Sequence, residues 1–128
     1  ETWPAWDGEP VPADDRVYTP HKVIRRTADH MIDHLAEVEA HLAGRTPLPD
    51  EWHASAITTA ADLTPFTAED LDEARSRLRR LAQIWSLRLD GLSAEQLDAE
   101  RGGWTVRQIA FHLAESTYYA DAMGPVRR

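Results

Sequence analysis

The sequence predicts an all-α domain with the pattern of a four-helix bundle. In three stretches, apolar residues recur at alternating spacings of about three and four residues, which is the period of an amphipathic helix. N-cap residues precede these stretches, and glycines follow two of them. No stretch shows sustained alternation of apolar and polar residues between turn signals, so we expect no sheet. Three long helices and one or two short ones remain, which is the bundle pattern.

The chain of 128 residues is long enough for one hydrophobic core, so one domain is predicted. Residues 1–18 are rich in proline and acidic side chains, a composition that cannot continue a helix or a central strand. We therefore expect an irregular lead-in over residues 1–18, a helical bundle domain over 19–124 and a C-terminal tail over 125–128. Trp3 and Trp6 either pack onto the bundle or mark the place of a missing neighbour.

The first long helix is predicted over residues 20–43. Thr19 is a good N-cap, Pro20 suits the first helical position, and Gly44 lies just past the end. A weaker helix is predicted from about Glu51 to Asp62, with Trp52 facing inward. The apolar stripe of the first helix consists of Ile24, Ala28, Met31, Leu35, Val38 and Leu42.

The second long helix is predicted over residues 68–90. Thr67 and Asp70 form a capping-box pattern before it, and Gly91 supplies the stop. Ser93 then starts a short turn of helix. The inward stripe of the second helix consists of Leu71, Ala74, Leu78, Leu81, Trp85 and Leu89.

The last helix is predicted over residues 106–122. Thr105 and Gln108 form its capping box, and Trp104 before the cap is placed to pack onto Ile109. Its buried face consists of Val106, Ile109, Leu113, Thr117 and Ala120.

Composition excludes several classes of function. The formal net charge of -8 disfavours nucleic acid as a partner, because binding a phosphate backbone requires a dominant basic face. No run of about 18 apolar residues and no signal-peptide pattern is present, so we expect no membrane association and a cytoplasmic protein. The sequence contains no cysteine, so any metal must be held by histidine, aspartate or glutamate.

Histidines on the predicted helices are the candidate metal ligands. His30 and His34 are four residues apart, so their side chains lie about 40° apart on one helix face and can hold one ion together. Glu37 and His41 fall within the same arc. His112, beside the apolar arc of the last helix, is the best third ligand. Three histidines and a water would leave the open position typical of catalytic zinc; the alternative is that these histidines only form hydrogen bonds at the surface.

Other polar residues have two readings each. Glu115, one turn from His112, is the candidate catalytic residue, either a general base or a partner that orients a ligand, and the alternative is an exposed helix carboxylate. His53 and His21 are expected at the surface. Tyr118 and Tyr119 either line a pocket beside His112 or only pack.

The segment over residues 103–119 is GWTVRQIAFHLAESTYY, with a tryptophan, a hydroxyl cap and a His-Leu pair. It resembles the second-helix signature of the DinB/YfiT-like superfamily of metalloenzymes, in which His112 matches the first histidine ligand. The stretch LRRLAQIWSLRLDGLSAEQLD resembles the first helix of that family and the connection after it. The stretch TPHKVIRRTADHMIDHLAEVEAHL resembles its last helix, in which His30 and His34 match the His-x-x-x-His ligands.

The resemblance implies a three-histidine site for a divalent metal ion, zinc above all, with nickel or manganese as alternatives. It also implies a thiol-dependent transferase or isomerase, or a hydrolase, that acts on a small-molecule substrate. The excess of arginine over lysine suggests a GC-rich genome, which fits a low-molecular-weight thiol such as mycothiol as co-substrate.

The order of the helices is rotated relative to the family, because the His-x-x-x-His helix comes first here. The site is then assembled in a permuted monomer, assembled between two chains, or lost. A homodimer is expected, because three apolar stripes leave one side of the bundle open and two-fold pairing is the commonest way to cover such a face. The competing function is a non-catalytic helical module for oligomerisation or binding, without metal.

Overall fold

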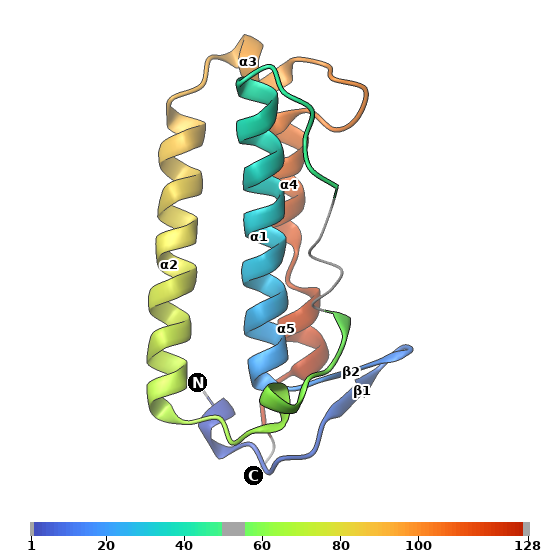
Figure 1. Cartoon of the computed structure of the whole chain (residues 1–128). Helices are drawn as coiled ribbons and strands as arrows, with labels where there is room; N and C mark the ends of the chain where they lie inside the picture. Colours follow the sequence, from blue (N-terminus) through green and yellow to red (C-terminus); the bar gives the residue numbers. More distant parts are fainter. Residues whose placement is uncertain (1, 50–55, 127–128) are drawn as a thin grey trace.

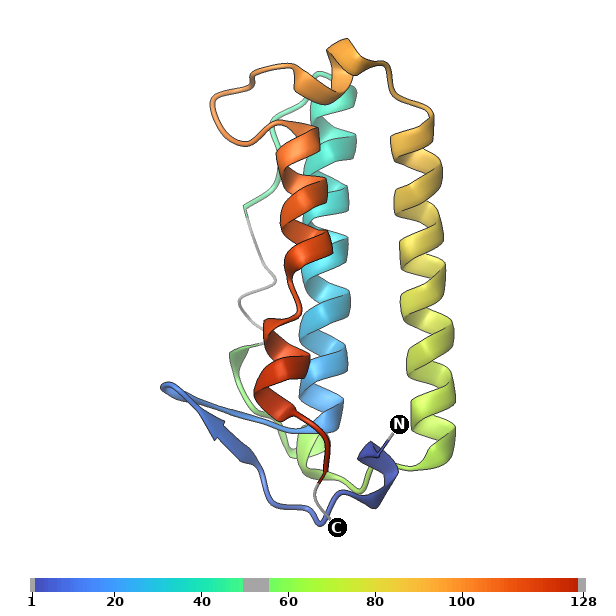
Figure 2. The same ribbon diagram turned by 180° about the vertical axis from the view of Figure 1, so that it is seen from behind.

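The computed structural model describes residues 2–49 and 56–126, which are mostly helical with a small two-stranded sheet. The long helices α1 (Pro20–Leu42) and α2 (Ala68–Asp90) run in the same direction (Figure 1). The chain then returns through α4 (Val106–Glu115) and α5 (Tyr118–Met123), which pack on a different side of α1 from α2 (Figure 2). α1 is therefore the central element of the fold.

Local capping signals set the ends of α1. The Thr19 side chain accepts a hydrogen bond from the backbone N–H of Lys22, and Pro20 occupies the first helical position. Gly44 has a φ of 67°, the left-handed conformation that favours glycine after a helix. The helix ends at Leu42, one residue before the predicted end.

The second long helix and the short helix α3 (Ala94–Asp98) begin where the sequence predicts. Thr67 and Asp70 form a complete capping box at α2, and Gly91 is its C-cap. Ser93 caps α3 in the same way, with Gln96 as its partner. These ends could be predicted because each depends only on residues within one turn of the helix.

The predicted last helix is interrupted. α4 ends at Glu115, and Ser116 leaves the helical conformation, with φ -82° and ψ 70°. The Ser116 hydroxyl donates to the carbonyl oxygen of His112 at 2.5 Å, a local bond that competes with the helix ladder. The chain resumes as α5, which turns Tyr119 and Met123 into a separate apolar cluster.

The expectation of no sheet is wrong. Strands β1 (Val11–Ala13) and β2 (Arg16–Tyr18) form an antiparallel hairpin in which Pro12 faces Val17. Asp14, in the turn, has a φ of 55°, a conformation that aspartate tolerates better than most residues. Each strand has three residues, too few for the periodicity that identifies strands in a sequence.

The lead-in packs onto the helices. Tyr18 is fully buried in an apolar cluster that joins the hairpin to α1 and α5. The other buried members of this cluster are Val23, Tyr119 and Met123. The partly buried residues packed against it are Trp3, Trp6, Val11, Ala13, Ala122 and Val126. Two hydrogen bonds then join the opposite ends of the described chain. The Trp3 indole donates to the carbonyl oxygen of Gly124 at 2.9 Å, and the Val126 N–H donates to the Thr2 hydroxyl at 3.0 Å.

The weaker helix predicted between Glu51 and Asp62 lies partly outside the described residues. Residues 50–55, with Trp52 and His53, lie outside the described residues. In the described remainder, a Thr59–Asp62 capping box begins the 3-10 helix η3 (Ala60–Leu63). This part of the chain therefore does not supply the α-helix that was expected up to Asp62.

A second apolar cluster joins α2 and α4 to α1. Trp85 of α2 is 5% exposed, and its indole N–H donates to the carbonyl oxygen of Met31 at 3.0 Å. Val38, Val106 and Ile109 complete the buried part of the cluster.

Among the described residues, no helix combines the length and the apolar character that crossing a membrane requires.

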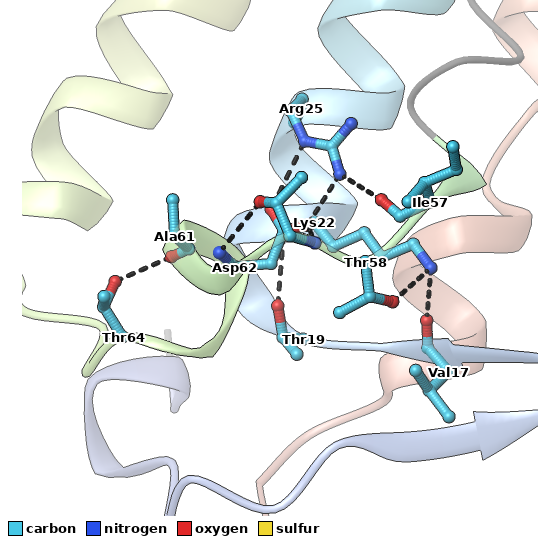
Figure 3. A network of polar contacts seen from close by, with 10 residues as sticks. Val17, Thr19, Lys22, Arg25, Ile57, Thr58, Ala61, Asp62 and Thr64 are labelled. Atoms are coloured by element: carbon cyan, nitrogen blue, oxygen red, sulfur yellow. Dashed lines mark hydrogen bonds and ion pairs between the residues drawn. The ribbon is translucent and has the colours of Figure 1, made fainter.

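A polar network holds the segment before α2 against α1 (Figure 3). The Arg25 guanidinium donates to both carboxylate oxygens of Asp62, at 3.3 and 2.6 Å, and to the carbonyl oxygen of Ile57. The Lys22 ammonium donates to the Val17 carbonyl and the Thr58 hydroxyl. Burial would raise the pKa of Asp62, but hydrogen bonds from Arg25 and the Thr59 backbone outweigh it and hold this pKa below its usual value.

Replacement of Asp62 by alanine is expected to lower the free energy of unfolding by about 2 kcal/mol, because it removes a charge-assisted bond and a cap together. The native pKa of Asp62 lies below its unfolded value of about 3.9, so the contribution is complete above that pH and is lost as the pH falls through the native pKa. Urea unfolding at pH 7 and near pH 3 measures both effects. Exposed Asp72 provides the control, Asp72→Ala, and equal losses for the two variants at pH 7 would contradict the prediction.

Candidate metal centre

Two helices bring the three predicted histidine ligands together. His30 and His34 lie on one face of α1, and His112 approaches them from α4. One ligand atom from each of the three residues lies within 4.8 Å of the others. The Nε2 atoms of His30 and His112 are 2.9 Å apart, although 82 residues separate them in the sequence. The three histidines come together within one chain, so their clustering does not require a partner subunit.

The donor set fits a divalent ion of the zinc type. Two ligands of a tetrahedral ion at about 2.0–2.1 Å lie roughly 3.3 Å apart, close to the 2.9 Å between the Nε2 atoms of His30 and His112, and ligand atoms of all three residues lie within 4.8 Å of one another. Burial lowers the pKa of His112, and the neighbouring His34 lowers it further, which favours the neutral imidazole that a metal requires. The opposing effect of the Glu115 charge is smaller.

Trp104 covers one side of the histidine cluster. Its ring is stacked beside His34, with centroids 6.5 Å apart, and lies 4.7 Å from the ring of His112. The side chain is half-exposed and follows the Gly102–Gly103 turn, in which Gly102 has a φ of 79°. The sequence predicts Trp104 against Ile109, whereas in the structure its ring lies beside two candidate ligands, His34 and His112.

A carboxylate contacts the cluster from α1. Glu37 Oε2 lies 2.9 Å from Nδ1 of His34, and its other oxygen lies 3.9 Å from Nε2 of His41. The helix period predicts Glu37 and His41 in the same arc as the histidines but indicates no role for them. The spacing of three residues between His34 and Glu37 is the signal that could have found this contact.

The remaining predicted site residues lie at the edge of the cluster or away from it. Glu115, the predicted catalytic residue, is exposed at the end of α4, and its catalytic role stays a prediction. Tyr119 is buried, and its ring centroid lies 6.3 Å from that of His30.

The Tyr118 hydroxyl donates to a carboxylate oxygen of Asp14 at 2.5 Å, which raises the pKa of Tyr118 to about 12. His21 packs against Phe66 near the start of α2.

An apolar groove adjoins the cluster between α1, α2 and α4. It has a volume of about 350 Å³, within the range of small-molecule sites. Its walls are mainly apolar, and His30, Thr27, Ser116 and Tyr119 add polar groups. The groove therefore places a candidate ligand histidine on the wall of an apolar cavity.

No protein-family model, curated protein sequence or solved structure matches this chain.

Proposed function

We propose that this protein is a DinB-like metal-dependent enzyme in which His30, His34 and His112 hold a divalent ion, most readily Zn²⁺. The convergence of these three imidazoles from two helices is the observation that carries the proposal. The three neutral imidazoles of His30, His34 and His112 would hold the ion, and the ion would then supply Lewis-acid activation of a water or thiol. The reaction class is a thiol-dependent transfer or isomerisation, or a hydrolysis.

The surrounding residues support a small-molecule substrate. The groove beside His30 is mostly apolar, so it favours a substrate with an apolar body over a highly charged one. The Thr27 and Ser116 hydroxyls on its wall can orient a polar group of that substrate near the histidines. The half-exposed Trp104 lies against His34 and His112, where it shields these two rings in part from water.

Metal content tests this function directly. Protein purified without a histidine tag and loaded with Zn²⁺ is expected to contain about one ion per chain by elemental analysis, because the site has one set of three ligands. The double variant His30→Ala/His34→Ala is expected to contain none. A variant at His21, which lies away from the cluster, is the matched control and should keep the ion. Equal metal content in the wild type and the double variant would overturn the proposal.

The same groove favours a second candidate function. Among the residues that the structure describes, α1, α2 and the α4–α5 pair are not joined by a further long helix, and the groove walls carry small side chains at Ala82, Ala110 and Ala114. A non-catalytic module that pairs with a second copy of the chain would insert a helix there. This function requires no metal, so stability measurements with and without a chelator distinguish it from the enzyme.

A further inference from the structure

The contact between Glu37 and His34 is local to α1. The two residues are three apart, which places both side chains on the same part of the helix surface. Their side chains are 31% and 16% exposed, so water screens the contact only in part. The distance of 2.9 Å between Oε2 and Nδ1 is that of a charge-assisted hydrogen bond.

This contact decides which nitrogen of His34 is available to an ion. A neutral imidazole carries one ring proton, and only the other nitrogen has a lone pair for a metal. An ionised carboxylate only accepts hydrogen bonds, so Glu37 favours the form of His34 with its proton on Nδ1. The lone pair is then on Nε2. Carboxylates that bond the outer nitrogen of a ligand histidine orient the ring and increase its basicity.

We propose that Glu37 is a positioning residue, whose carboxylate fixes the tautomer and ring orientation of His34 and so sets the metal affinity of the site. This inference rests on the proposed function. Glu37 is not itself one of the clustered ligands among the described residues. It acts through His34, and the second carboxylate oxygen faces His41, which helps to hold the carboxylate on this side of the helix.

Three variants test the role of Glu37. Glu37→Ala removes the acceptor, whereas Glu37→Gln keeps an acceptor oxygen and removes the charge. Glu39→Ala is the control, because Glu39 lies on the same helix and pairs with Arg88 of α2, away from the cluster. Affinity for Zn²⁺ alone is measured by competition with a chromophoric chelator. We expect Glu37→Ala to bind about 10- to 100-fold more weakly than the wild type, Glu37→Gln to be intermediate, and Glu39→Ala to be unchanged.

A second measurement reads the tautomer without metal. Long-range proton–nitrogen NMR correlations of the wild type should show the His34 proton on Nδ1, and in Glu37→Ala the proton should move toward Nε2. Wild-type His34 with its proton on Nε2 would overturn the inference. So would Zn²⁺ binding by Glu37→Ala that is as tight as that of the wild type, although the proposed function would then stand. A wild type that binds no Zn²⁺ overturns the proposed function together with this inference.

Discussion

Chelation of the metal is expected to lower the melting temperature of the Zn²⁺-loaded protein by about 15 °C. An ion that binds only the folded chain adds about 4 kcal/mol of stability when its free concentration is about 1,000 times the dissociation constant. For a domain of this size, each kcal/mol corresponds to roughly 4 °C. The three ligands come from α1 and α4, so the unfolded chain does not hold them together. Thermal unfolding followed by circular dichroism, with and without chelator, measures the shift.

The double variant His30→Ala/His34→Ala is the control for this experiment. Its melting temperature should not respond to Zn²⁺ or to chelator, whatever its stability without metal. A wild type that melts at the same temperature in both conditions would favour the non-catalytic module instead.

Loss of the Trp85 side chain is expected to cost about 3–5 kcal/mol of unfolding free energy. Trp85 is 5% exposed in the cluster that joins α2 to α1, and its indole bond to Met31 crosses between these helices. Trp85→Ala removes both the buried ring and the bond, whereas Trp85→Phe keeps most of the apolar area. Urea unfolding should therefore give an intermediate loss for phenylalanine.

Leu87 provides the matched control for Trp85. It lies two residues further along α2 and is 65% exposed, so Leu87→Ala should change the unfolding free energy by about 0.5 kcal/mol or less. If Trp85→Ala were no more destabilising than Leu87→Ala, the cluster would not be what attaches α2 to the rest of the fold.

The helices could be predicted where their ends depend on neighbouring residues. The Thr67–Asp70 capping box begins α2 within one turn, and Thr19 begins α1 in the same way. The break between α4 and α5 could not be predicted from apolar spacing, because the stripe continues through it to Ala120. It depends instead on the Ser116 hydroxyl, which turns back to the carbonyl of His112.

The candidate site was predictable in its ligands but not in its surroundings. His30 and His34 share a face because of helix geometry alone, and the apolar arc of the last helix placed His112 toward the core. The position of Trp104 depends on a glycine turn, and the bond of Glu37 depends on one side-chain conformation among several. The spacing of three residues allows the contact between Glu37 and His34 but does not by itself select it, and no residue spacing indicates the position of Trp104.

The hydrogen bonds between Trp3 and Gly124, and between Val126 and Thr2, have a consequence for gene architecture. Because residues 2 and 126 are neighbours in space, a short peptide could connect them without moving any helix. New ends could then be cut in the segment between α1 and α2. α1 would be synthesised after α4, with the cluster of His30, His34 and His112 unchanged in space. The arrangement of the histidines in space therefore does not depend on the order in which the ribosome synthesises the helices.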